Sequence, residues 1–201
     1  MQITAPRRAA FLIVVLASLV SGCAGTIAHM QEVSADRAPT GPRPGKAMVM
    51  FMRPSGLGSA IQSTVFEVQG NNVSLIGVVA AKAKVAYEVD PGTRLFMVVG
   101  ENADFMTAEL LPNKTYYARV EPRLGLWKAR FGLEPVPAKE LSTADFKGQL
   151  DECRWDVKSP SADAWLGANL ASVQSKRLDY YPDWAAKPAA EKPRLSPEDG
   201  R

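Results

Sequence analysis

The chain has 201 residues and a formal net charge of +3. Two of the positive charges, Arg7 and Arg8, lie in a predicted signal peptide, so the rest of the chain is close to neutral and its charge does not point to nucleic acid as a partner. One histidine and two cysteines are too few for a zinc site built from these ligands.

The first segment of the chain has the features of an export signal. Arg7 and Arg8 form a short basic region, and residues 9–20 follow as an apolar run without charges. A membrane-spanning helix needs about 20 apolar residues, so this run is too short to span and fits the apolar core of a signal peptide. The next residues, Val20-Ser21-Gly22-Cys23, resemble the lipobox of bacterial lipoproteins. The resemblance implies that residues 1–22 are removed and that Cys23 is the site of lipid attachment.

This resemblance implies a protein of the bacterial cell envelope that is held to a membrane by covalent lipid. In lipoproteins a diacylglycerol is attached to the cysteine sulfur, and a fatty acid such as palmitate acylates the new amino terminus. Each buried CH₂ group contributes about 0.8 kcal/mol to membrane binding, so several chains on Cys23 would hold the domain at a bilayer. Ala24 stands where Asp favours retention in the inner membrane, which favours an outer-membrane location facing the periplasm.

Residues 23–46 are predicted to form a lipidated tether. They are polar and contain Pro39, Pro42 and Pro44, and such a composition buries too little apolar area to offset the entropy of ordering. The only histidine, His29, lies in this segment, where we expect it to be solvated rather than positioned for catalysis. We therefore predict no catalytic residue.

Residues 47–137 are predicted to form an antiparallel β-sandwich. Apolar or alternating runs recur at intervals of about ten residues and are separated by turns rich in Gly, Pro and Asn. The alternation predicts that one face of each strand packs in a core, with Phe131 among the core side chains, while the other face meets water. The runs predict about seven or eight strands. They are residues 48–52, 63–69, 73–79, 84–89, 93–99, 106–111, 115–121 and 127–133.

A row of methionines marks the first of these strands. Met48, Met50 and Met52 share one face, with Val49 and Phe51 on the other. The pattern favours a central strand that is buried on both faces, although a methionine row can also bind soft metals in the envelope. Because no His or Cys accompanies the row, we expect burial and no metal or cofactor.

The pattern changes to helix after the sandwich. Residues 138–184 are predicted to be a helical extension, whose main helix follows the capping pair Ser159-Pro160 and ends near Leu178. Residues 185–201 combine prolines with mixed charges and are predicted to be a disordered tail. Cys153 lies in the extension, and it is either an inert, partly buried thiol or a partner in an intermolecular disulfide.

The stretch from about residue 46 to 135 resembles a lipoprotein family of unknown function whose domain is similar to PEGA-like and carboxypeptidase-regulatory-like β-sandwiches. Three motifs carry the resemblance: an opening strand with an Arg-Pro exit, a Pro-Gly turn, and a turn into a strand with two tyrosines. They are Met50-Phe51-Met52-Arg53-Pro54, Val89-Asp90-Pro91-Gly92-Thr93 and Leu110-Leu111-Pro112-Asn113-Lys114-Thr115-Tyr116-Tyr117. Asn113 stands where glycine is commoner, and Asn tolerates a left-handed backbone. The resemblance implies a fold and an envelope location and brings no catalytic residues.

Two surfaces are candidates for contact with a partner. Arg119, Lys128 and Arg130 are predicted to share a solvent face, as a plain solvated surface or as a basic patch for anionic lipid or an acidic partner. A second group comprises Tyr180, Tyr181 and Trp184, which either pins the helix to the sandwich or anchors a partner, since Tyr and Trp are enriched in binding hot spots.

These observations favour a membrane-anchored, non-catalytic binding or assembly module whose partner is an envelope protein or the cell wall. One alternative is a carrier of a small ligand or lipid, which would need a cavity in the sandwich. A third is a hydrolase with a pair of carboxylates, since Asp151, Glu152 and Asp163 show no partner in the sequence and such pairs form only in the fold.

Overall fold

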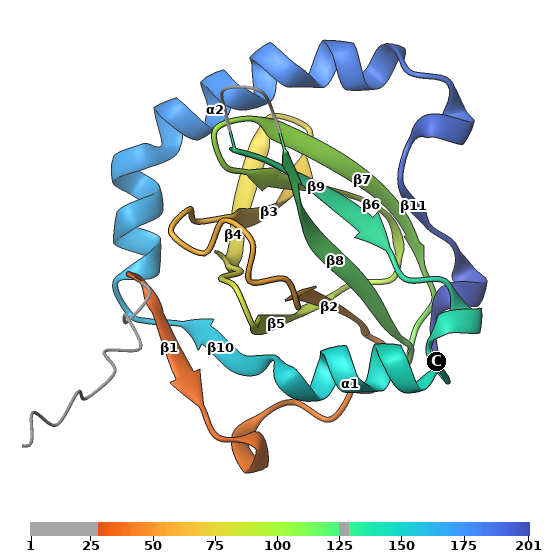
Figure 1. The fold of residues 1–201 in the computed structure, drawn as a ribbon. Helices are drawn as coiled ribbons and strands as arrows, with labels where there is room; N and C mark the ends of the chain where they lie inside the picture. The colour runs from red at the N-terminus through yellow and green to blue at the C-terminus, as the bar shows by residue number, and fades with distance from the viewer. Residues whose placement is uncertain (1–27, 125–128) are drawn as a thin grey trace, which may run out of the picture.

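The computed structural model describes residues 28–124 and 129–201. Two β-sheets face each other, with the long helix α2 (Ala162–Ala186) arched over the outer face of one sheet and the shorter helix α1 (Ala144–Glu152) on the outer face of the other (Figure 1). The predicted lipid attachment site Cys23 and the predicted contact residue Lys128 lie outside the described residues.

The first sheet holds six strands in the order β1-β10-β5-β2-β8-β9. Their bounds are β1 (Met30–Val33), β2 (Ala47–Arg53), β5 (Ala83–Val89), β8 (Thr115–Leu124), β9 (Ala129–Pro135) and β10 (Arg154–Lys158). The second sheet holds five strands in the order β11-β7-β6-β3-β4. Their bounds are β3 (Thr64–Gln69), β4 (Asn72–Val78), β6 (Gly92–Val99), β7 (Ala103–Leu110) and β11 (Arg194–Leu195). The connections contain the short 3-10 helices η1 (Ala35–Arg37), η2 (Ala138–Glu140), η3 (Ala189–Glu191) and η4 (Pro197–Asp199).

Alternate residues of the predicted strands form the core between the two sheets. In β2, Val49 and Phe51 face this core and are fully buried, while the methionines of the same strand pack under α1. Phe131 of β9 is 1% exposed and belongs to the same core, as the alternation predicts. Burial of side chains of this size stabilises a fold by roughly 1.5–3 kcal/mol each. The methionine row is therefore part of the packing, because β2 lies in the middle of its sheet and is covered on both faces.

A mainly β, sandwich-like fold with a C-terminal helix is confirmed, whereas the purely antiparallel arrangement of about seven or eight strands was wrong. The described residues form eleven strands, and the pairs β2–β8, β5–β10 and β7–β11 are parallel. In each parallel pair, the chain returns to the end of the sheet at which the first strand began before the second strand starts. The run-and-turn pattern of the sequence does not reveal such a crossover.

The additional strands are short and come from segments without a strand pattern. β1, β10 and β11 have four, five and two residues, which is too short for alternation to be visible. β1 lies inside the predicted tether and pairs antiparallel with β10, so the tether prediction was wrong for this part of residues 23–46. Backbone pairing at the sheet edge and burial of Met30, which is 8% exposed, order this segment.

The predicted disordered tail is also ordered. Leu195 of β11 is fully buried in the core between the sheets. Ser196 and Asp199 form a capping box at η4, and the backbone of Arg201 exchanges hydrogen bonds of 2.8 and 3.1 Å with Thr115. The prediction for residues 185–201 was wrong because one buried leucine and a set of backbone bonds outweigh a polar, proline-rich composition.

Helix α2 continues past its predicted end near Leu178. It includes Pro182 and ends at Ala186. Proline inside a helix removes a backbone hydrogen bond and costs about 3 kcal/mol, but Trp184 is 6% exposed and holds the last turns on the second sheet. Within residues 28–124 and 129–201, no helix combines the length and the apolar character that crossing a bilayer requires.

Candidate functional site

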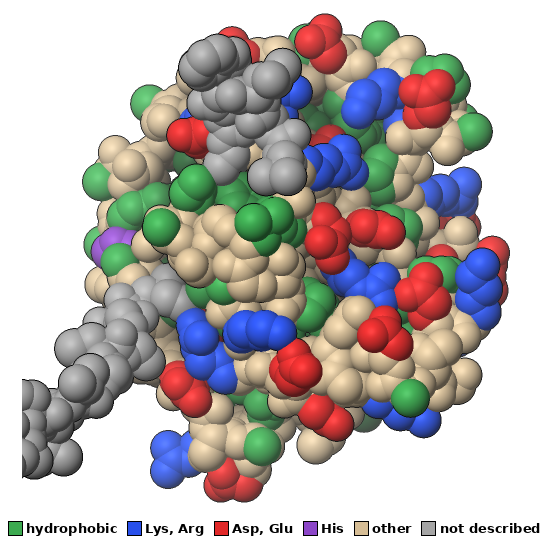
Figure 2. All heavy atoms as spheres, viewed as in Figure 1, with side chains coloured by type: hydrophobic (Ala, Val, Ile, Leu, Met, Phe, Trp, Pro, Cys, Tyr) green, Lys and Arg blue, Asp and Glu red, His purple; other side chains and the backbone are tan. Residues whose placement is uncertain are grey.

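Arg119 does not lie on an exposed basic patch. It is 8% exposed and donates hydrogen bonds of 2.9 Å to Gln149 Oε1 and 2.8 Å to Glu140 Oε2, which fasten α1 and η2 to β8. In the register of β8 and β9, Arg119 is opposite Glu134 and the exposed Arg130 is opposite Arg123. Figure 2 shows positive and negative side chains interspersed over the visible face. The structure thus separates Arg119 from Arg130.

The predicted aromatic group packs on the second sheet and remains partly open to solvent. Trp184 is buried beside Phe105, with ring centroids 5.6 Å apart, and the Tyr181 ring stacks on Trp184 at 5.7 Å. Tyr181 is 36% exposed and Tyr180 is half-buried. Trp184 therefore pins the helix, while the two tyrosines stay accessible beside it.

The C-terminal half of α2, the start of β7, the end of β8 and the start of β9 line an open hollow of about 500 Å³. We call this the α2 hollow and define it by Asp104, Arg123, Arg130, Tyr180, Asp183, Trp184 and Lys187, which are among its lining residues. It joins Arg130 with Tyr180 and Trp184, which the sequence placed on two separate surfaces. Four of these residues, Asp104, Arg123, Asp183 and Lys187, were missed by sequence reasoning.

Two local features shape the wall of this hollow. The side chain of Asn102 pairs with the backbone of Phe131, donating to its carbonyl oxygen at 3.1 Å and accepting from its amide at 2.9 Å. This pairing joins the end of the second sheet to β9. At Gly132 an added Cβ would lie 2.6 Å from the Arg123 guanidinium, so glycine leaves the space in which Arg123 lies over β9. Gly132 is opposite Glu121 in the register of the two strands, two positions from the Arg123–Arg130 pair. A glycine this close to an arginine of the neighbouring strand is the sequence signal that could have pointed to this corner.

The electrostatics of the α2 hollow are mixed. Arg123 Nη1 lies 3.8 Å from Asp104 Oδ2, which is close enough for attraction and too long for a hydrogen bond. Asp104 is 8% exposed, and its Oδ2 has no hydrogen-bond partner among the described residues. The same holds for Nε1 of Trp184. Because a buried polar group without a partner costs about 1–3 kcal/mol, this corner retains an unsatisfied donor and an unsatisfied acceptor.

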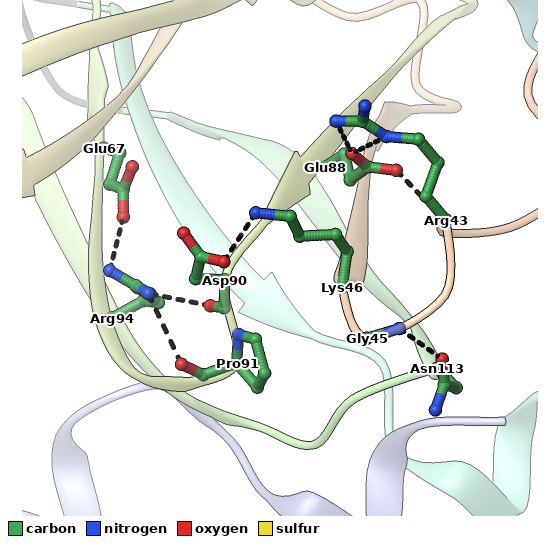
Figure 3. Close-up of polar contacts among 9 residues, drawn as sticks. All are labelled: Arg43, Gly45, Lys46, Glu67, Glu88, Asp90, Pro91, Arg94 and Asn113. Atoms are coloured by element: carbon green, nitrogen blue, oxygen red, sulfur yellow. Dashed lines mark hydrogen bonds and ion pairs between the residues drawn. The ribbon is translucent and has the colours of Figure 1, made fainter.

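A second polar group lies at one end of the sandwich and is satisfied internally. Glu67 is 2% exposed, accepts a 2.6 Å hydrogen bond from the Tyr87 hydroxyl, and lies 3.5 Å from Arg94 Nη1. Burial and this hydrogen bond raise the pKa of Tyr87 above its usual value. Arg94 also donates to the carbonyl oxygens of Asp90 and Pro91, so the group joins β3 to the turn before β6 (Figure 3).

Neighbouring ion pairs in Figure 3 hold the segment before β2 against β5. Lys46 Nζ lies 2.6 Å from Asp90 Oδ1, and Arg43 donates to Glu88 Oε1 at 2.6 Å. Because these carboxylates already have cationic partners at close range, the ion pairs at this end of the sandwich join segments of the fold and do not form a ligand site.

Two of the three carboxylates singled out in the sequence are in ion pairs with lysines. Glu152 pairs with Lys82 at 2.5 Å, and Asp163 pairs with Lys158 at 3.4 Å. Among residues 28–124 and 129–201, no group of three or more His, Cys, Asp and Glu side chains is arranged to hold a metal ion. His29 is not a free linker residue, because its Nδ1 lies 3.0 Å from Ser161 Oγ at the start of α2.

No protein-family model matches the chain, and no curated protein matches it. The resemblance to a lipoprotein family with a PEGA-like sandwich therefore stays a prediction from its three motifs, and the α2 hollow has to be interpreted from its own chemistry.

Proposed function

We propose that the protein is a lipid-anchored lipoprotein of the cell envelope that acts as a non-catalytic binding or assembly module, and that the α2 hollow is its contact site. The lipobox residues that end at Cys23 support the anchor. The observation that carries the contact site is the hollow itself, where charged side chains and unpaired buried polar groups meet at an opening of about 500 Å³.

The position of the hollow fits a module that points away from its membrane. Six residues lie between Cys23 and Met30 at the start of β1, and such a length spans at most about 25 Å. His29 touches Ser161 beside the start of α2, whereas Trp184 is near its end. At 1.5 Å per residue, the length of helix between these points is about 35 Å. A short anchor thus leaves the hollow at the opposite end of α2 from the bilayer.

The charges around the hollow disfavour the carrier of lipid as an alternative. A lipid chain needs an enclosed apolar cavity, whereas this hollow is open and five of its lining side chains are charged: Asp104, Arg123, Arg130, Asp183 and Lys187. A polar partner or polar ligand suits such a wall better.

Charge reversal at the hollow tests the contact site. We expect Arg130→Glu combined with Lys187→Glu to remove envelope partners from pull-downs of the full-length anchored protein, because like charges now face the partner. The melting temperature should change little, since both side chains lie at the surface. The matched control is Lys147→Glu on α1, an exposed lysine on the opposite sheet, which should keep the partners. Unchanged pull-downs from the double variant would contradict the proposed site.

A further inference from the structure

The α2 hollow carries side chains of both charges. Arg123, Arg130 and Lys187 are cationic, and Asp104 and Asp183 are carboxylates. The two carboxylates repel a purely anionic ligand, and the three cationic side chains repel a purely cationic one. A ligand that itself carries one charge of each sign can be attracted by both sets.

Two atoms in the wall of the hollow have unused hydrogen-bonding capacity. Asp104 Oδ2 can accept and Trp184 Nε1 can donate, and neither has a partner among the described residues. Their side chains are buried, with exposed fractions of 8% and 6%, and buried polar groups in this state are rare. Both residues line the hollow, and the last torsion of Asp is broad. The wall thus carries one unused acceptor, which suits an ammonium group, and one unused donor, which suits a carboxylate.

The size of the hollow limits the ligand. Its volume of about 500 Å³ lies within the roughly 300–1,000 Å³ of small-molecule sites. A free amino acid or the end of a short peptide suits this space. The half-buried ring of Tyr180 adds a surface on which an ammonium group or an aliphatic side chain can lie.

We propose that the α2 hollow binds a zwitterionic ligand, an ammonium and a carboxylate a few ångströms apart, as in an amino acid or a short peptide. The ammonium lies against Asp104 and Asp183, and the carboxylate lies against the three cations of the hollow. Arg123, which is 3.8 Å from Asp104 Oδ2, turns to the ligand carboxylate as the ammonium takes its place. This inference rests on the proposed function and names the ligand class of its site.

Calorimetric titration of the full-length protein in detergent with four probes tests the ligand class. The probes are alanine, the dipeptide Ala-Ala, its N-acetyl derivative, which lacks the ammonium, and its C-terminal amide, which lacks the carboxylate. We expect alanine or Ala-Ala to bind, and both blocked dipeptides to bind about tenfold or more weakly, since each loses charge-assisted hydrogen bonds. Binding of alanine with rejection of the dipeptide assigns free amino acids, and binding of the dipeptide assigns peptide ends.

Substitutions of residues that line the hollow test whether the probe binds there. Asp104→Asn and Arg130→Gln should each weaken binding of the better unblocked probe about tenfold, while Lys147→Gln on α1 should leave it unchanged. Because Asp104 is buried, its variant is compared with wild type by melting temperature, and Arg123→Gln at the exposed guanidinium provides a second variant that spares the fold.

Two results would overturn the inference: no binding of either unblocked probe at millimolar concentration, or equal binding of the blocked dipeptides. If this occurs while charge reversal at Arg130 and Lys187 still abolishes the pull-down, the ligand class is wrong and the binding module stands. If charge reversal also has no effect, the proposed site itself fails.

Discussion

Arg53 shows how a single buried charge organises a loop of this fold. Its guanidinium is fully buried over the Phe131 ring, and it donates to the carbonyl oxygens of Leu57, Gly58 and Ile61 at 2.7, 2.8 and 2.9 Å. Burial lowers the pKa of Arg53, and the charge of Glu121 opposes that shift. The Arg-Pro exit of the first predicted strand thus holds the following loop against the core.

Replacement of this side chain should loosen the loop and the core together. We expect Arg53→Met to lower the free energy of unfolding by about 2–4 kcal/mol, because several carbonyl oxygens lose a charged donor worth roughly 1.5–3 kcal/mol each, part of which water recovers. Urea denaturation measures the loss. Arg37→Met, at an exposed position of η1, is the control and should change stability by less than about 0.5 kcal/mol. Equal stability of the two variants would show that the loop does not depend on Arg53.

Cys153 illustrates a thiol that the fold makes unreactive. It is 2% exposed at the end of α1, and burial raises its pKa to about 11, although nearby Lys84 acts in the opposite direction. This supports the inert interpretation of the thiol over an intermolecular disulfide, because the thiolate is the reactive form.

The thiol should therefore resist alkylation until the protein unfolds. At pH 8 a pKa of about 11 leaves roughly one thiol in a thousand ionised, against about one in four at an unperturbed pKa near 8.5. Iodoacetamide labelling followed by mass spectrometry should be slow in the native protein and fast in urea. Since the folded pKa is raised, the stability that the thiol contributes is present below the unfolded pKa and is lost as pH rises toward 11. A Cys153→Ala variant should lack that loss; labelling at equal rates in both states would contradict the burial.

Several single residues could be understood from the sequence, and others could not. Asn113 has φ 63° and accepts a hydrogen bond from the amide of Gly45, as the turn chemistry of Asn allows. Phe131 is a core residue because it follows the alternation of β9. Asp104 and Lys187, by contrast, are 83 positions apart and meet only in the folded chain. No local sequence pattern indicates contacts between residues so far apart, so the hollow could not be predicted from the sequence.

At the scale of elements, the segment after α2 closes one edge of the sandwich. Residues 187–201 run along β7 through β11 and reach β8, where Gly200 packs against the Tyr116 ring so closely that a Cβ would lie 2.6 Å from it. This segment links the second sheet to the first at the end of the chain (Figure 1).

Leu195 is the apolar anchor of this segment, and its truncation should be costly. We expect Leu195→Ala to lower the free energy of unfolding by about 2–5 kcal/mol, since a fully buried leucine leaves a cavity. Denaturant melts compare it with Leu178→Ala on α2, where the side chain is 62% exposed and the expected loss is below about 0.5 kcal/mol. A loss of similar size in both variants would mean that the segment does not contribute to the core.

The predicted strands match the structure where the alternation of apolar and polar residues extends over several positions. The hairpin β3–β4 turns at Gly70, with φ 58°, as the Gly-Asn signal predicts. The edge strands β1 and β11 were not predicted, because they have only four and two residues. They form by pairing with backbone groups of a neighbouring strand that would otherwise lack partners. Sequence patterns report local preference, whereas these strands exist through tertiary pairing.

At the scale of the whole molecule, the proposed anchor at Cys23 lies near one end of the chain, and the proposed contact site lies at the C-terminal end of α2. The order of layers puts α1 and α2 on opposite outer faces, so the α2 hollow opens at the boundary between α2 and both sheets. The proposed anchor and the proposed contact site thus belong to different parts of the chain, and we expect each to be removable without the other.

The anchor at Cys23 is the central claim, and metabolic labelling of cells with an alkyne fatty acid tests it most directly. The chain offers a matched control, because its other cysteine is buried in the domain. We expect label on the wild-type protein and on Cys153→Ala, and none on Cys23→Ser, which should also keep its signal peptide because the lipoprotein peptidase acts after lipid transfer. Label on the Cys23→Ser protein, or a wild-type protein without label that is released from membranes by salt washing, would contradict the account.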